Sequence, residues 1–586
     1  MKFRWTLAPA QAVLAGQLAH QLKISPLLAQ CLLNRGFGEP AAMSGFLQPR
    51  LKQLADPFLL PNMAAAVERL LLARERKEPL VIFGDYDVDG VTSTALLVEV
   101  LRALGWQVHY YLPHRMEEGY GLSRDGVENC LKKFPVTLLL AVDCGSTTVD
   151  SIAWLRQRGV DVIVLDHHQV SSPPPAATAL VNPQLGPAPG DSAALGAADA
   201  GASPGDFREL CSAGLAFKLA HALLKRGREV GLPGAAEFDL RPLLDLVALG
   251  TIADIVPLTG ENRILVAAGL ERLNNTQRPG LVALKQVSQC PAGLGTYEVG
   301  FQLAPRLNAA GRLETAEEAL HLLLARELAE AMPIAQILDA RNRERQQIER
   351  TMAEEAVGLV RAKFQPANDF VIVEGQLCWH IGVVGIVASR VLQQFYRPTI
   401  IVGGDGEAWR GSGRSIAGFD LAAALRECSD LLLRHGGHAM AAGLTIHPNK
   451  IEAFRTRLNE LARRALPPEA FQPPLRLDAE VGLAEVDLAC LAALHQLKPT
   501  GQGNPTVQLC ARNLGHQRPP QRLGAEKQHV KLWVTDGAVT HETVWWGAGN
   551  DLLPTGRFDL AFAPQINEYN GRRTVQLKLL DWRPAQ

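Results

Sequence analysis

The chain has 586 residues, of which 47% are hydrophobic and 20% are charged, and its formal net charge is −1. This is the composition of an ordinary globular protein with room for about two to four domains, and it excludes a disordered or fibrous chain. A net charge near zero gives no global electrostatic case for a polyanionic partner, although a local basic groove is still allowed.

Residues 1–60 are predicted to form a small helical lead-in. Two positive charges precede an alanine- and leucine-rich stretch there, but Pro9, Gln11 and Gln17 interrupt the apolar segment that a secretory signal needs. No stretch approaches the roughly 18 apolar residues of a membrane-spanning helix. The nine cysteines include no Cys-x-x-Cys pair, which favours reduced thiols over a zinc site. We therefore expect a cytoplasmic protein without a membrane partner.

Residues 61–325 alternate between apolar runs and helical stretches, which predicts a buried parallel sheet. The first run, residues 80–83, leads into Asp85, Asp87 and Asp89. Alternation on an extended segment places the three carboxylates roughly on one side. Carboxylates at the end of a buried strand need a positive partner, and three of them suggest more than one hard cation. A solvated acidic turn is the alternative interpretation.

Three more apolar runs, each interpreted as a buried strand, lead to an acidic residue: 137–142 to Asp143, 160–165 to Asp166, and 243–249 to Asp254. Sites in open α/β sheets form beyond the carboxyl ends of the strands, so the four acidic ends can converge. His167 and His168 follow Asp166, and one can bind a metal while the other hydrogen-bonds nearby. Carboxylate with imidazole suits Mg²⁺ or Mn²⁺, and the histidine favours Mn²⁺.

The remaining sequence predicts four further segments. Residues 171–204, rich in proline, alanine and glycine, predict a tolerated surface insertion, and 326–364 predict a long connecting helix. A second α/β pattern follows over 365–468, with helices expected at 382–395 and 420–433. Short β-rich runs with Asp-Gly and Asn-Gly turns over 469–586 suggest a small barrel.

Several of these segments resemble the motifs of the DHH phosphoesterase family. The matching segments are Asp85-Tyr-Asp-Val-Asp-Gly-Val-Thr-Ser93, Val142-Asp-Cys-Gly145, Asp166-His-His168 and Gly250-Thr-Ile-Ala-Asp254. Gly436-Gly-His-Ala-Met-Ala-Ala-Gly443 is similar to the signature of the associated DHHA1 domain. Arg306-Leu-Asn-Ala-Ala-Gly-Arg312 and Gly411-Ser-Gly-Arg-Ser415 narrow the resemblance to the members that degrade single-stranded DNA from its 5′ end.

The resemblance covers nearly the whole chain in order and implies an α/β fold class. A parallel-sheet DHH catalytic domain (61–325) would be joined by a long helix (326–364) to an α/β DHHA1 domain (365–468). A C-terminal β-barrel of the OB-fold type (469–586), which binds single strands, would follow.

The resemblance also implies a two-metal site for Mn²⁺ or Mg²⁺. In this site Asp143 bridges the two cations and Asp87 serves one of them. Asp89, His167 and Asp254 serve the other. Many relatives carry a histidine where this chain has Phe83, and Asp85 is the candidate replacement. The catalytic candidates are Asp143, Asp166 and His168, the last two either as ligands or as neighbours of ligands.

Arginine is the natural partner of a phosphate because its guanidinium binds in a bidentate manner. The segment 411–415, rich in small residues and donors, could cradle a terminal phosphate, and the resemblance assigns Ser412 and Arg414 to the 5′ phosphate. The other substrate-binding candidates are Arg115, Arg306, Arg312, Gly437 and His438. Candidates for single-strand contact in the barrel are Trp533, Trp545, Arg572 and Arg573.

The function that follows is a hydrolase: a metal-dependent 5′→3′ exonuclease that releases mononucleotides in recombination, mismatch and base-excision repair and stalled-fork processing. The resemblance implies single-stranded DNA, single-strand DNA-binding protein and a RecQ-type helicase as partners of a monomer. The alternative is a DHH-family oligonucleotide or small-nucleotide phosphodiesterase. The third domain argues against it, because such enzymes are usually shorter.

Overall fold

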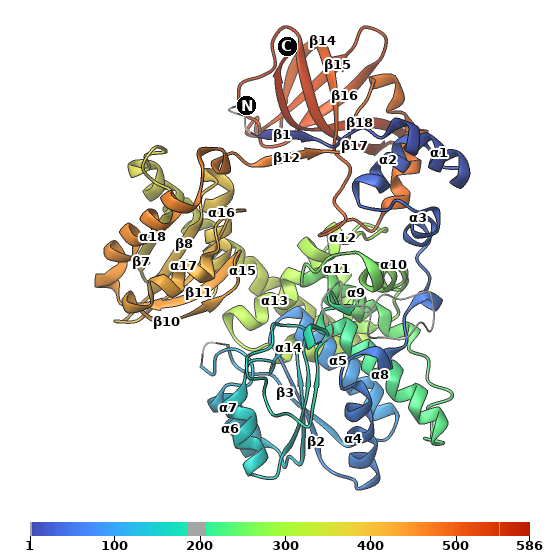
Figure 1. Ribbon diagram of the computed structural model, residues 1–586, viewed down its shortest axis with the longest axis vertical. Coiled ribbons are helices and arrows are strands. Elements are labelled where there is room, and N and C mark those ends of the chain that lie inside the picture. The colour runs from blue at the N-terminus through green and yellow to red at the C-terminus, as the bar shows by residue number, and fades with distance from the viewer. Residues whose placement is uncertain (1–2, 116, 186–206, 550, 586) are drawn as a thin grey trace. The chain divides into compact units, whose positions relative to one another are not determined.

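The computed structural model describes residues 3–115, 117–185, 207–549 and 551–585 (Figure 1). The chain forms two compact units. Unit 1 comprises residues 1–44, 344–496 and 506–586, and unit 2 comprises 45–343 and 497–505. Most of the expected insertion at 171–204 lies outside the described residues. In the part of the chain that is described, no helix has both the length and the apolar character that crossing a membrane requires.

Unit 2 contains the expected parallel sheet, in the order β3-β2-β4-β5-β6. Its strands are β2 (Leu80–Gly84), β3 (Val108–Tyr111), β4 (Leu138–Val142), β5 (Asp161–Leu165) and β6 (Ala179–Val181). Leu80 and Ile82 pack into one apolar cluster, and Val81 and Phe83 pack into another. Both faces of the sheet are therefore covered, which explains why its strands are continuously apolar.

Helices cover the two faces of this sheet (Figure 1). One face packs against α4 (Met63–Glu75), α5 (Val88–Ala103) and α8 (Ser212–Glu229). The other face packs against α6 (Arg124–Lys133) and α7 (Val149–Gln157). The loops at the carboxyl ends of β2, β4 and β5 begin at the acidic residues of the sequence motifs.

The strand expected at residues 243–249 is wrong, because this segment belongs to helix α9 (Leu244–Ala253). The apolar run continues beyond residue 249, and nearly every side chain of the helix is buried. A helix that is buried on all sides lacks the polar face that distinguishes it from a buried strand in sequence. Asp254 is thus the C-cap of a helix and does not follow a strand.

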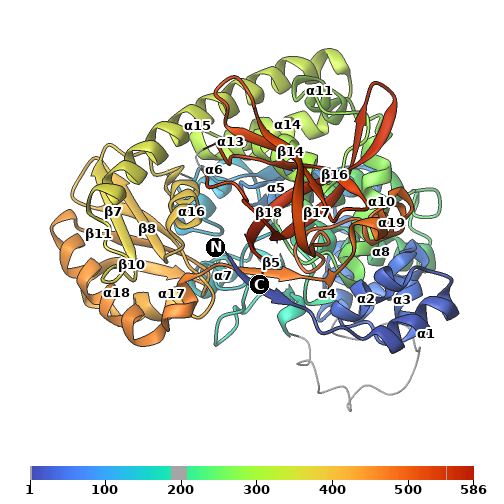
Figure 2. The same ribbon diagram turned by 90° about the horizontal axis from the view of Figure 1, so that it is seen from above.

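Further helices complete unit 2: α10 (Gly260–Asn274), α11 (Pro279–Val287), α12 (Thr296–Glu298), α13 (Ala304–Leu313) and α14 (Glu317–Leu324). A π-helical turn, Val299–Leu303, leads directly into α13. The 36-residue helix α15 (Leu328–Lys363) fills the stretch in which the sequence predicts a connecting helix, and Figure 2 shows it as one continuous helix. It begins in unit 2 and ends in unit 1.

Unit 1 contains a mixed sheet in the order β10-β11-β9-β8-β7. Its strands are β7 (Ile372–Leu377), β8 (Thr399–Gly404), β9 (Trp409–Arg414), β10 (Leu432–Gly437) and β11 (Ala441–Ile446). The helices α16 (Val384–Phe395), α17 (Leu421–Glu427) and α18 (Ile451–Ala465) accompany it. The helix expected over 420–433 is wrong in its second half: α17 ends at Glu427, and Leu432 pairs with Ile446 of β11. Tertiary strand pairing there overrides a leucine-rich helical propensity.

The expected C-terminal β-barrel is also present in unit 1. Its strands are β13 (Ala479–Glu480), β14 (Leu509–Leu523), β15 (His529–Thr535), β16 (Thr540–Trp545), β17 (Phe558–Tyr569) and β18 (Arg572–Pro584). Their order is β13-β14-β15-β16-β18-β17, and pairing of β14 with β17 closes the sheet on itself. Asn570 and Gly571, both at positive φ, make the tight turn between β17 and β18.

The N-terminal segment is not purely helical. Strand β1 (Arg4–Leu7) pairs in parallel with β12 (Pro474–Leu477) beside the barrel, as Figure 1 shows. Three helices follow it: α1 (Ala12–Leu22), α2 (Pro26–Asn34) and α3 (Pro40–Leu47).

A buried arginine fixes the segment 497–505 within unit 2. The Arg263 side chain, 2% exposed, donates from Nη1 to the carbonyl oxygens of Leu497 (2.9 Å) and Pro499 (3.1 Å). Its Nη2 donates to Lys498 O (2.9 Å), and its Nε donates to Phe46 O (2.7 Å). One guanidinium thus pairs four carbonyls from two distant parts of the chain.

We predict that Arg263→Met will destabilise unit 2 by about 3 kcal/mol or more, because it leaves several buried carbonyls without donors. Thermal and urea unfolding of the whole chain measures the change. Arg464→Met, on the exposed surface of α18, is the matched control. An Arg263→Met protein as stable as the control would contradict this role.

Candidate metal centre

The loop after β2 brings three carboxylates to the carboxyl edge of the sheet. Asp85 is 1% exposed. Asp87 caps α5, accepting hydrogen bonds from the backbone N–H groups of Asp89 (2.9 Å) and Gly90 (3.1 Å). Gly90 lets the loop close tightly, because a Cβ there would lie 2.5 Å from the carbonyl oxygen of Asp85. The motif therefore ends one strand and starts one helix within a few residues.

The N-terminus of α8 holds two of the buried carboxylates. Asp89 accepts from the backbone N–H of Ser212 (2.7 Å) and of Ala213 (2.8 Å), so its carboxylate caps this second helix. Asp143 follows β4 with φ at 64° and accepts from the Ser212 hydroxyl at 2.9 Å. Backbone donors at a helix N-terminus favour negative charge, which offsets part of the cost of burying it.

A second network orients the residues after β5. Asp166 accepts from the Ser146 N–H (3.0 Å), and its other oxygen lies 2.7 Å from Nδ1 of His168. The Asn182 amide donates to the carbonyl oxygen of His168 and to the hydroxyl of Ser146, 2.8 Å each. The Asp166 carboxylate is thus fully engaged in holding His168 and the β4 loop in place.

His167 lies among three of the carboxylates. Its Nε2 is 3.5 Å from Asp143 Oδ1, 3.6 Å from Asp254 Oδ2 and 3.9 Å from Asp89 Oδ2. Among the described residues, three groups have ligand atoms all within 4.8 Å of one another: Asp85, Asp87 and Asp143; Asp89, His167 and Asp254; and Asp143, His167 and His168. Asp143 belongs to two of these groups.

Burial and mutual repulsion shift the ionisation of this cluster. Burial, and then the carboxylate of Asp89, raise the pKa of Asp143 well above its usual value. The same causes raise the pKa of Asp254 to about 9. Burial also opposes the imidazolium form of His168, but the bond to Asp166 prevails and raises the pKa of His168 to about 9. Keeping these buried carboxylates ionised costs free energy unless cations bind to them.

The donor set fits hard divalent cations. Asp85 Oδ1 and Asp254 Oδ2 are buried and accept no hydrogen bond from any described residue. Oxygen atoms in that position, together with one imidazole nitrogen, match the ligand preferences of Mg²⁺ and Mn²⁺. The groups around Asp143 can hold two such cations side by side.

Helix α13 closes over the first motif. The Val88 N–H donates to the Asn308 side chain (3.2 Å), and Gly311 approaches Tyr86 so closely that a Cβ would lie 2.7 Å from its carbonyl oxygen. Arg306 donates from Nε to Asp339 Oδ1 (2.9 Å) and from Nη1 to Gln302 O (2.6 Å). These bonds anchor α13 to α15, and substrate binding by Arg306 stays a prediction.

Two other arginines of unit 2 remain substrate candidates. The Arg115 guanidinium lies 5.1 Å from the centre of the Tyr86 ring, and its charge acts on Asp85. Arg312 lies in the last turn of α13, and its charge acts on Tyr86. Both arginines are therefore close enough to residues 85–89 for their charges to act on them.

The remaining substrate candidates lie in unit 1. Ser412 and Arg414 are on β9, and Arg414 Nη1 donates to the Ser412 hydroxyl (2.8 Å). A Cβ on Gly385 of α16 would lie 2.8 Å from Arg414 Nη2, so this glycine lets the first turn of α16 approach both donors. Gly437 and the exposed His438 form the end of β10 and the following turn.

The barrel candidates differ in exposure. Trp533 is half-buried beneath the Arg518 guanidinium, 3.4 Å from its ring centre. Arg572 and Arg573 are exposed at the start of β18, and Arg573 pairs with Glu568 (2.8 Å). The prediction for Trp545 is wrong: this side chain is 8% exposed and belongs to the barrel core, whereas its neighbour Trp546 is 52% exposed.

Several residues of the site carry no signal in the sequence. Ser212 and Asn182 contact the motifs from distant positions, and a lone serine or asparagine is not distinctive. Tyr120 donates to the carbonyl oxygen of Asp143 (3.3 Å) and lies against His168. Only Asn308 falls inside a recognised motif, between Arg306 and Arg312.

Comparison with known proteins gives a consistent set of matches. Three family models match: the N-terminal domain of the DHH family (residues 79–251), the DHHA1 domain (368–464) and the RecJ OB domain (477–581). The chain is 37% identical over 589 residues to the single-stranded-DNA-specific exonuclease RecJ of Bacillus subtilis (strain 168), covering 99% of this chain and 71% of that protein. It is 34% identical over 582 residues to RecJ of Escherichia coli (strain K12), covering 95% of each.

The structure is similar to the crystal structure of RecJ in complex with Mn²⁺ from Thermus thermophilus. The TM-score is 0.83 at 30% identity, over 100% of this chain and 80% of that chain. The structure of RecJ from the same organism in complex with Mg²⁺ matches with a TM-score of 0.77 at 29% identity, over 100% of this chain and 79% of that chain.

We predict that Ser212→Ala will weaken Mn²⁺ binding about tenfold, because Asp143 loses the hydroxyl that orients it while the backbone donors to Asp89 remain. Isothermal titration of the whole chain with Mn²⁺ measures the affinity. Ser389→Ala is the control, since that hydroxyl donates to the Gly385 carbonyl oxygen within α16. Equal Mn²⁺ affinities for the two folded variants would rule out this role of Ser212.

Proposed function

Because the chain belongs to the RecJ family of single-stranded-DNA-specific exonucleases, we propose that it hydrolyses single-stranded DNA from the 5′ end to mononucleotides with Mn²⁺ or Mg²⁺. The observation that carries the proposal is the convergence of five carboxylates and His167 at one edge of the unit 2 sheet. The small-nucleotide alternative has no comparable support, since the curated relatives match over nearly the whole chain, barrel included.

We assign the metal ligands from the three groups of ligand atoms. Asp143 would bridge two cations, with Asp85 and Asp87 serving one and Asp89, His167 and Asp254 serving the other. Bound divalent cations supply an ionised water near neutral pH and neutralise the phosphate and the leaving oxygen. The chain needs no serine or cysteine nucleophile for this chemistry.

The protein's own residues position these ligands and supply a hydrogen-bond donor. Ser212 orients Asp143, and the start of α8 orients Asp89. His168 is oriented by its bond to Asp166, which raises the pKa of the imidazole, and from this position it can donate a hydrogen bond to a phosphate or leaving oxygen. We therefore place Asp166 and His168 next to the metal ligands and not among them.

Substrate binding is assigned to groups in both units. In unit 2, Arg115 and Arg312 would contact phosphates near the metal centre. In unit 1, Ser412 and Arg414 would bind the 5′ phosphate, helped by the N-terminus of α16, and Gly437 and His438 would approach the backbone. Trp533, Arg572 and Arg573 of the barrel would contact the single strand.

The biological setting rests on the family resemblance alone. We propose a monomeric cytoplasmic enzyme of DNA recombination and repair. Its partners would be single-strand DNA-binding protein and a RecQ-type helicase.

Asp143→Asn is expected to reduce hydrolysis by roughly a thousandfold or more, because the amide keeps the shape but loses the charge that both cations share. End-labelled single-stranded DNA, the matching duplex and a dinucleotide, each with Mn²⁺ or EDTA, provide the measurement. We expect mononucleotides from the 5′ end of the single strand only, and none with EDTA. Faster hydrolysis of the dinucleotide would instead assign the protein to the small-substrate branch.

Arg414→Gln is expected to lower the preference for a 5′-phosphorylated over a 5′-hydroxyl single strand about tenfold, because the amide replaces a bidentate cation. The ratio of kcat/KM for the two substrates measures the effect. Arg426→Gln, on the exposed face of α17, is the control. An unchanged ratio would show that the phosphate is bound elsewhere.

A further inference from the structure

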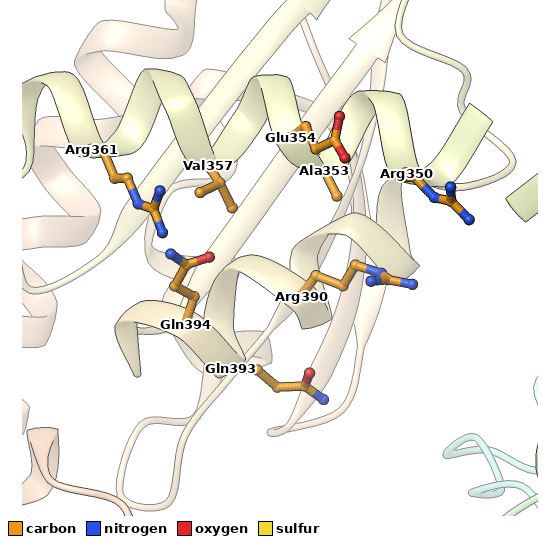
Figure 3. A pocket seen from close by; sticks show the side chains of 8 residues that line it. All are labelled: Arg350, Ala353, Glu354, Val357, Arg361, Arg390, Gln393 and Gln394. Carbon is orange, nitrogen blue, oxygen red and sulfur yellow. The ribbon is translucent and has the colours of Figure 1, made fainter. Parts of the chain in front are cut away.

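A groove of about 510 Å³ lies between α15 and α16 in unit 1, far along the sequence from the metal ligands (Figure 3). One wall is a stripe of α15 at helical spacing, and the other is a stripe of α16. Figure 3 shows Arg361 and Gln394 pointing toward one another across it, while Arg350 and Arg390 extend toward its other end. The residues that line it are Arg350, Ala353, Glu354, Val357, Arg361, Arg390, Gln393 and Gln394.

The groove exists because the two helices pack through small apolar side chains. Ala353 and Ala356 of α15 and Val387 and Ala388 of α16 belong to one buried cluster. The polar stripes beside that contact remain open to solvent, and Arg350, Glu354 and Gln393 are exposed. The shape is therefore a fixed property of two rigid helices.

The groove carries positive charge that the protein only partly neutralises. Arg350 has no hydrogen-bond or ion-pair partner among the residues described. Within the described parts of the chain, Arg390 donates from Nε alone, to Glu349, which is also paired with Arg345. Arg361 donates to the Gln394 side chain when that amide presents its oxygen, and a glutamine adds no charge. Glu354 is the single carboxylate of the lining.

We propose that this arginine groove binds the phosphodiester backbone of single-stranded DNA, in addition to the nucleotide being hydrolysed. The inference rests on the proposed function, which supplies a polyanionic substrate. Arg350 and Arg361 are eleven residues apart on α15, a rise of about 16 Å, which spans several phosphates at roughly 3.4 Å per nucleotide in a stacked strand.

The chemistry of the lining specifies backbone recognition. Guanidinium groups bind phosphate oxygens in a bidentate manner, and the side-chain amides of Gln393 and Gln394 add neutral donors. The lining contains no aromatic side chain on which a base could stack. Binding in the groove is therefore independent of base sequence and sensitive to salt.

The test uses the full chain in EDTA, where binding is measured without cleavage, with fluorescently labelled long and short oligothymidylates. Arg350→Gln with Arg361→Gln should weaken binding of the long strand by about two- to fivefold per arginine. The slope of log Kd against log salt should fall by about 0.7 for each lost contact. Glu354→Gln, which removes the single carboxylate of the lining, should strengthen the same binding. Arg464→Gln, on α18, controls for a general loss of surface charge.

Opposite effects of the arginine and glutamate variants on the long strand, with unchanged hydrolysis of the shortest substrate, would establish the groove as a backbone site. Long-strand affinities equal to that of Arg464→Gln in all variants would overturn the proposal. The proposal would also be overturned if the arginine variant lost binding of an acidic peptide but bound DNA as the wild type does. A wild-type protein that binds the long strand in this way but never cleaves it would refute the proposed function and leave the groove standing.

Discussion

The constraint on which the site depends is the cost of burying several carboxylates within a few ångströms of one another. Asp85, Asp89 and Asp143 are each at most 2% exposed, and no buried lysine or arginine of the described chain pairs with them. Such a cluster is stable only if the backbone supplies donors and if cations complete it. The surrounding fold can be understood as the means of meeting both requirements.

The ends of strands and helices meet these requirements in three ways. Strand ends deliver Asp85 and Asp143, a helix C-terminus delivers Asp254, and the N-termini of α5 and α8 supply the N–H donors that hold Asp87 and Asp89. The helix N-termini stabilise negative charge. Asp254 has no such support, and burial together with the Asp89 carboxylate raises its pKa to about 9. Asp87, Asp89 and Asp143 are thus held by hydrogen bonds before any cation binds, as a preorganised centre requires.

The sequence predicts the parts of this arrangement whose signals are local. Apolar runs ending in acidic residues predict β2, β4 and β5, and the motif that starts at Asp85 predicts a multinuclear centre. The same reasoning fails at α9, because a wholly buried leucine-rich segment has no periodicity that separates helix from strand. It misses Ser212, since its contact with Asp143 joins residues 69 apart. It also misplaces Trp545, because the burial of a side chain is decided by tertiary packing.

The charge of the centre also explains the chain's near-zero net charge. Buried carboxylates that bind cations repel a phosphate when the cations are absent, so affinity for the strand must come from positive groups elsewhere. In our proposal these groups lie on separate elements of unit 1: Arg414 on β9, and Arg350, Arg361 and Arg390 along the arginine groove. The acidic side chains of one unit and the basic side chains of the other nearly cancel in the net charge. The net charge therefore gives no sign of nucleic-acid binding. The positions of the charged side chains in the fold, and not their sum, separate the metal-binding carboxylates of unit 2 from the arginines of unit 1.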